Sequence, residues 1–92
     1  MYLEIVSPEA TLFSGEVTSV TVPGVNGEFQ MLNNHAPIVS ILKEGQVKVE
    51  SKNIQLGKDV EAKFTKSDNG VWLAINSGTL ELKDNKLIIL AD

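Results

Sequence analysis

Apolar and polar residues alternate with a period of two along most of the chain. Leu3 and Ile5 flank Glu4, for example. The same alternation recurs in four further segments: 18–22, 46–50, 60–65 and 80–82. Because successive side chains of a β-strand point to opposite faces of a sheet, this period predicts strands with one buried and one solvated face. No window of twelve residues carries the uninterrupted 3.6-residue repeat of an amphipathic helix.

Two segments, Val71–Ile75 and Leu87–Leu90, are continuous apolar runs. They indicate strands that are covered on both faces, or strands that meet a partner. Turn signals such as Pro23-Gly24 and Asn26-Gly27 separate the strand segments, and Asn-Gly supplies the positive φ angles of a tight hairpin. About nine or ten short strands fit between the turns. The pattern therefore predicts a single all-β domain over residues 1–92, an antiparallel β-sandwich or flattened barrel.

The predicted two-layer architecture also indicates which side chains form the core. We expect most of it from these thirteen residues: Leu3, Ile5, Val20, Val22, Leu42, Val47, Val49, Phe64, Leu73, Ile75, Leu80, Leu82 and Ile89.

Charge and composition narrow the classes of function. The net charge is −4 and the eight lysines are scattered with no arginine, which argues against a nucleic-acid partner. The chain has no cysteine, so disulfides, thiolate metal sites and thiol catalysis are excluded. No apolar run approaches the roughly 20 residues of a membrane helix, so we expect membrane association only through a partner.

Residues that could carry chemistry are few. His35 is the only histidine and has no acidic neighbour closer in sequence than Glu28, so a metal site with three or four ligands is not expected. No serine lies in a G-x-S-x-G elbow. No glycine-rich loop is followed by the Lys-Ser/Thr pair that cradles phosphate. We therefore expect no catalytic residue and no cofactor.

The segment Asn33-Asn34-His35-Ala36-Pro37 lies between two apolar runs. Asparagine tolerates left-handed backbone, and Pro37 favours an extended residue before it, so the segment predicts a tight turn. His35 could pin this turn, contribute to chemistry or belong to a surface that another protein contacts, and these interpretations stay open on the residues alone.

An ordered series of short motifs runs along the chain. It begins with Glu4–Glu9 (EIVSPE), Leu12–Val17 (LFSGEV) and Val22–Phe29 (VPGVNGEF). Its most specific part is Asn34–Val39 (NHAPIV), followed by Leu42–Gly45, Ser77–Leu82 and the closing Leu90–Asp92. In this order, and over most of the chain, the motifs resemble the epsilon subunit of F-type ATP synthases.

The resemblance implies a β-sandwich on the central stalk of a proton- or sodium-driven rotary synthase. In that family the sandwich packs against the gamma subunit, touches the polar loops of the c-ring and couples rotation without catalysis. The resemblance implies no small-molecule substrate for this chain. It also implies a peripheral position at the cytoplasmic face of a bacterial inner membrane, with an organellar origin left open.

The resemblance further indicates partner-binding residues. Glu28 matches an acidic residue that lies against the polar loop of the ring, and Ser7 matches a region near gamma. We expect the rest of the partner surface to be an exposed apolar edge ringed by polar groups. It would comprise Phe29, Met31, Asn33, Asn34, His35, Ala36, Pro37 and Ile38.

Two features depart from the family pattern. Ser51–Lys66 lengthens the chain between Gly45 and Ser77, and the alternation at Val60–Phe64 predicts that this insertion is an ordered hairpin. The family usually continues after Leu90–Asp92 into a two-helix hairpin, which blocks ATP hydrolysis in some members and binds ATP in others. We expect neither activity from these 92 residues.

A free-standing sandwich that binds a small ligand or carbohydrate is the alternative from a different class. Such modules display aromatic side chains in one plane, whereas the five here are spread over the sequence: Tyr2, Phe13, Phe29, Phe64 and Trp72. A hydrolase is a third option. Co-purification with a gamma-type subunit would separate the first interpretation from the other two.

Overall fold

The structure is a computed structural model that describes all residues, 1–92. It contains ten strands and one short 3-10 helix: β1 Tyr2–Val6, β2 Thr11–Glu16, β3 Ser19–Gly24, β4 Gly27–Leu32, β5 Ile38–Leu42, β6 Gly45–Glu50, η1 Glu61–Lys63, β7 Phe64–Lys66, β8 Gly70–Ile75, β9 Gly78–Lys83 and β10 Lys86–Ala91. The predicted all-β class and strand number are confirmed.

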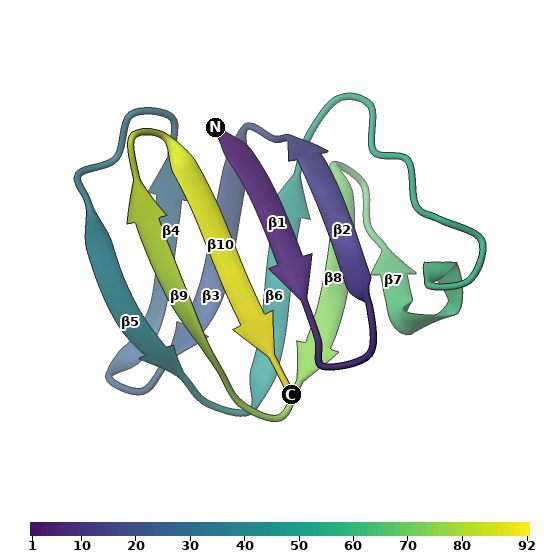
Figure 1. Cartoon of the computed structure of the whole chain (residues 1–92). Helices are drawn as coiled ribbons and strands as arrows, with labels where there is room; N and C mark the ends of the chain where they lie inside the picture. Colours follow the sequence, from purple (N-terminus) through teal and green to yellow (C-terminus); the bar gives the residue numbers. More distant parts are fainter.

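The strands form two layers of five (Figure 1). The first layer has the order β2-β1-β10-β9-β5, and the second has the order β4-β3-β6-β8-β7. The layers join at a corner, where Gly24 of β3 pairs with Leu42 of β5. We call the end of the sandwich that carries Met1 the N-terminal end and the opposite end, where Asp92 lies, the C-terminal end.

One strand pair differs from the predicted antiparallel arrangement. β1 and β10 run parallel, with Tyr2 beside Lys86 and Val6 beside Leu90, whereas every other pair is antiparallel. Alternation within a strand reports its faces but carries no information on the direction of its neighbour. A hairpin turn fixes the antiparallel direction for sequential strands, and no turn connects these two.

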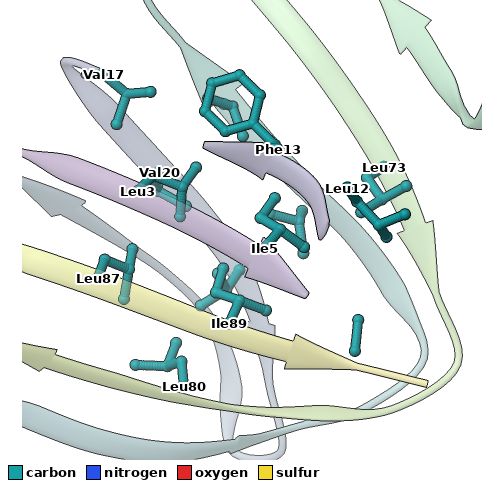
Figure 2. Packing of buried hydrophobic residues seen from close by; sticks show 14 of the residues in the cluster. Leu3, Ile5, Leu12, Phe13, Val17, Val20, Leu73, Leu80, Leu87 and Ile89 are labelled. Atoms are coloured by element: carbon teal, nitrogen blue, oxygen red, sulfur yellow. The ribbon is translucent and has the colours of Figure 1, made fainter. Parts of the chain in front are cut away.

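The core lies between the layers and is one cluster of 22 buried residues. All thirteen residues predicted for the core are buried. Figure 2 shows part of the cluster, with Leu3 and Ile5 of β1 next to Leu87 and Ile89 of β10, and with Val20 of β3 from the other layer. Burial of each such aliphatic side chain contributes roughly 1.5–3 kcal/mol to folding, so these shared residues hold the two layers together.

The two continuous apolar runs alternate in burial. In β8, Val71, Leu73 and Ile75 are buried while Trp72 is 38% exposed. In β10, Leu87 and Ile89 are buried while Leu90 is 53% exposed. Coverage on both faces is therefore wrong for this chain by itself, because each layer of a two-layer sandwich has a solvated outer face.

The insertion Ser51–Lys66 is ordered differently from the prediction. Residues 51–60 form no strand, Glu61–Lys63 form the 3-10 helix, and only Phe64–Lys66 pair with β8. The predicted hairpin is therefore wrong. Val60 and Phe64 are nevertheless buried in the core, because a spacing of four residues brings two side chains to one side of a helical turn as well as of a strand.

Candidate partner-binding surfaces

The predicted partner edge runs along β4, which pairs only with β3 and so lies at an edge of the second layer. Glu28 follows the β3–β4 turn at the C-terminal end. The turn at 33–37 follows the strand at the opposite end. At about 3.3 Å per residue, Glu28 and Asn33 are roughly 16 Å apart along the strand. A single small contact cannot include both, so they are two separate candidate sites.

Glu28 is part of a chain of charged and aromatic contacts on the outer face of the second layer. Its carboxylate lies 3.3 Å from Lys48 Nζ, and the Glu28 side chain is 55% exposed. The same Nζ lies 4.7 Å from the centre of the Trp72 ring, within cation–π range. Lys48 and Trp72 are directly opposite each other on β6 and β8, and β3 separates Lys48 from Glu28. An exposed pair of this kind contributes little to folding, so its importance depends on what the surface meets.

The turn between β4 and β5 is held by its own backbone and by a neighbouring turn. Asn34 has a φ of 66°, a left-handed conformation that asparagine tolerates, and its backbone N–H donates to Asn85 Oδ1 at 2.8 Å. His35 N–H donates to the Leu32 carbonyl at 3.2 Å, and the His35 ring nitrogen Nδ1 lies 2.6 Å from the Ala36 carbonyl. The contacts of His35 are thus local to the turn, as expected of a structural pin.

The N-terminal side of this turn is also attached to the start of the chain. The Met1 amine donates to the Asn33 side-chain oxygen, and also to the Val17 carbonyl at 3.4 Å. Ala36 and Pro37 are exposed and complete the turn.

The apolar residues expected on the partner edge face inward. Met31 is 0% exposed and belongs to the core, so its predicted place on an exposed rim is wrong. Phe29 and Ile38 are half-buried and pack against the core. The cause is the alternation in β4, where Phe29 and Met31 take the inward positions and Glu28, Gln30 and Leu32 the outward ones.

A larger exposed apolar surface lies on the outer face of the first layer. The sequence pattern indicated a partner contact only for its β10 part, as one of two alternatives for Leu87–Leu90, and gave no indication of the part on β5. Val39 and Ile41 on β5 are 75% and 62% exposed, and Leu90 on β10 is 53% exposed. The strand register adds half-buried Ile88 beside them and half-buried Val6 across from Leu90. We call these five residues, Val6, Val39, Ile41, Ile88 and Leu90, the apolar face. Thr79 and Glu81 of β9 lie between its two halves.

Ser7 adjoins the apolar face at the C-terminal end. The turn that contains Ser7 is closed by the Ser7 Oγ, which donates to the Ala10 carbonyl at 3.2 Å, and by backbone bonds between the same two residues. An open hollow of about 440 Å³ is lined by Ser7 together with Ile41 and Leu90. The Ser7 segment and the apolar face therefore form one continuous surface.

A larger hollow lies elsewhere and mixes charges of both signs. It is an open groove of about 1030 Å³ between the insertion and the β7–β8 turn, and lysines and carboxylates mix in its lining, among them Lys52, Lys66, Glu61 and Asp68. No three His, Cys, Asp or Glu residues come close enough to hold a metal ion. The structure contains no helix with the length and apolar character needed to span a bilayer.

The chain as a whole, beyond these surfaces, is similar to a known family. The family model for the β-sandwich domain of the ATP synthase delta/epsilon chain matches residues 1–92. The chain belongs to this family. The match confirms the resemblance that the ordered motifs indicated.

Two relatives among the ATP synthase epsilon chains illustrate the range of lengths. The epsilon chain of Campylobacter curvus (strain 525.92) is 39% identical over 92 residues, which are all of this chain and 60% of the relative. That of Chlorobium limicola is 38% identical over 90 residues, which are 98% of this chain and 86% of the relative. The chain thus spans three-fifths of some epsilon chains and most of others.

Solved structures show the same fold. A chain in the central stalk and c-ring structure of the Tetrahymena thermophila mitochondrial ATP synthase superposes with a TM-score of 0.74 at 14% identity, covering 99% of this chain and 62% of that chain. A chain in the Euglena gracilis mitochondrial enzyme gives a TM-score of 0.72 at 19% identity, covering 97% and 48%. Both likenesses concern the β-sandwich fold.

Proposed function

We propose that this epsilon-type β-sandwich is a subunit of the central stalk that joins the gamma subunit to the polar loops of the c-ring. Its role is mechanical: it transmits rotation between ring and catalytic head, and it performs no chemistry itself. It reaches the cytoplasmic face of the membrane through the complex. Family membership supports this proposal, as does the presence of two outer faces with different chemistry.

The observation that carries the proposal is the apolar face. Exposed Val39 and Ile41 lie on the outer face of the same layer as exposed Leu90, on the two sides of β9, and large exposed apolar side chains gathered on one face of a domain mark a protein contact. The hollow beside it includes Ser7, whose segment resembles the part of the family near gamma. We therefore assign gamma to the apolar face.

The second face supports the ring contact. Glu28 lies on the outer face of the second layer, whereas the apolar face lies on the outer face of the first. The two partners would therefore contact different layers of the sandwich. A polar ring loop suits this charged surface, whereas the apolar face suits a permanent subunit interface.

The first experiment tests the gamma assignment with one charge on each face. Ile41→Asp places a carboxylate in the apolar face, and the matched control Thr65→Asp places one on the outer face of the second layer, on β7. We expect Ile41→Asp to weaken binding of the purified chain to the gamma subunit by at least tenfold, measured by titration calorimetry, while Thr65→Asp changes it less than twofold. Circular dichroism of both variants checks that the fold persists.

Equal binding of gamma by wild type and Ile41→Asp would overturn the assignment of this face. Binding that is lost equally in both variants would show that gamma recognises net charge rather than the apolar face.

A further inference from the structure

The Glu28–Lys48–Trp72 contacts form an ordered unit on an otherwise exposed surface. Lys48 Nζ lies between the Glu28 carboxylate, at 3.3 Å, and the Trp72 ring, whose centre is 4.7 Å away. The Lys48 side chain is only 32% exposed, although lysine is normally among the most exposed residue types. The two contacts of its ammonium group restrict its position.

We propose that Lys48 is a positioning residue that holds Glu28 ready for the ring contact, and that Trp72 holds Lys48 in turn. This inference rests on the proposed function, because it requires that Glu28 meets a ring loop. A carboxylate has about four acceptor positions, so one contact with Lys48 leaves others free for a donor on the partner. Glu28 is 55% exposed, so a partner can reach them.

The physical advantage is that Glu28 is ordered before binding. Immobilising a side chain at an interface weakens binding, and a side chain that is already restrained in the free protein avoids that loss. Loss of Lys48 would also remove a positive charge near Glu28, which by itself would strengthen attraction to a basic loop. Charges this close together lie within the Debye length of about 8 Å at physiological salt, so salt weakens this opposing effect without removing it. Our proposal is that the loss of ordering outweighs it, and the direction in which Lys48→Met changes binding decides between the two effects.

Trp72 is the only tryptophan of the chain, so it reports on this unit directly. Removal of the ammonium group in Lys48→Met should shift the emission of Trp72 in the free chain. The matched control is Lys52→Met, because Lys52 is exposed, lies in the insertion and takes part in no ion pair in the structure.

The test is a double-mutant cycle on binding to the cognate gamma–c-ring subcomplex in detergent, at physiological salt. Lys48→Met should weaken binding by about three- to tenfold, and Lys48→Arg should restore it, because arginine can contact both a carboxylate and an aromatic face. In a Glu28→Gln background Lys48→Met should cause no further loss, since Lys48 acts through Glu28. Lys52→Met should leave binding unchanged.

The outcomes separate the two proposals. If Glu28→Gln leaves binding unchanged, the ring contact at Glu28 is wrong and this inference is overturned with it. If Glu28→Gln weakens binding but Lys48→Met does not, only the positioning role is overturned. The positioning role is also overturned if Lys48→Met weakens binding as much in the Glu28→Gln background as in wild type. Thermal unfolding should be unchanged in all variants, which excludes a general loss of structure.

Discussion

The outer faces of the two layers differ in the contacts that their exposed side chains make within the chain. On the first layer, Val39, Ile41 and Leu90 are exposed with no apolar neighbour above them. On the second layer, Glu28, Lys48 and Trp72 contact one another from three different strands. The first face gains free energy only when another surface covers it, whereas the second is already stable in water. The same sandwich therefore carries one outer face suited to an apolar interface and one suited to a polar contact.

The two faces share a single core, so the largest expected effect comes from a change that damages both. Met31→Ala removes a fully buried side chain of β4 and should lower the free energy of unfolding by about 2–5 kcal/mol. The adjacent outward residue Leu32 is 54% exposed, so Leu32→Ala is the control and should change stability by less than about 0.5 kcal/mol. Urea denaturation measures both. Similar changes in the free energy of unfolding for the two variants would contradict the burial of Met31.

Two glycines test the layers separately. A Cβ at Gly70 in the second layer would lie 1.7 Å from the Val49 carbonyl oxygen, and one at Gly78 in the first layer 2.5 Å from the Leu90 carbonyl oxygen. Both alanine variants force strands apart, so we expect a loss of about 1–3 kcal/mol or more, larger for Gly70→Ala. A Cβ at Gly57 would come closest to the Asp59 carboxylate, at 3.0 Å, which can turn away, so Gly57→Ala is the control. Thermal denaturation should rank the three in that order, and a reversed order would contradict the close approach of the strands at Gly70.

A single substitution on the outer face of the first layer should reduce its exposed apolar surface and leave the second layer unchanged. Leu90→Ser should reduce binding of a hydrophobic dye and self-association of the purified chain, with little change in stability, because Leu90 is half exposed on the outer face. Trp72→Ser changes an exposed apolar residue of the other face and should affect self-association less, since Lys48 covers part of that ring. Dye fluorescence and analytical ultracentrifugation measure the two effects. A stronger effect of Trp72→Ser than of Leu90→Ser on dye binding and self-association would mean that the outer face of the second layer is the more exposed apolar surface.

The smallest expected effect on folding is that of Glu28→Lys. It replaces an exposed ion pair with Lys48 by a repulsion, and exposed pairs contribute about 0–1 kcal/mol, so the free energy of unfolding should fall by no more than about 1 kcal/mol. Binding to the c-ring should nevertheless weaken if the loop there is basic. Unfolding of the domain by this substitution would mean that Glu28 is needed for folding, and would contradict its assignment to a partner contact.

Alternation predicted the buried face of each strand because that face is fixed by local geometry. Val20 and Val49, for example, are paired across β3 and β6 and are both buried, as their patterns indicated. In β4 the same alternation puts Met31 on the inward face, which contradicts its expected place on an exposed apolar edge. For β4, the alternation of apolar and polar residues thus predicts burial correctly, whereas the expected partner edge does not.

The apolar face and the insertion could not be predicted in the same way. Val39 and Ile41 lie in the stretch Ile38–Leu42, where apolar residues take outward as well as inward positions and the polar Ser40 faces inward, so the stretch gives no sign of which face is exposed. In the insertion, Val60 and Phe64 fit a strand or a single helical turn equally well. The contact of Lys48 with Glu28 depends on three strands whose order alternation does not specify.

The parallel pairing of β1 with β10 has a consequence for how the chain reaches this structure. Residue 2 pairs with residue 86, and β10 also lies between β1 and β9, so the first layer cannot close until almost the whole chain is available. The strands of the second layer all fall within residues 19–75 and can pair earlier. Contacts between distant residues slow folding because a long loop must close before they form. During synthesis, the second layer can therefore form before β10 is available to pair with β1. The surface assigned to gamma, which includes β10, is completed last.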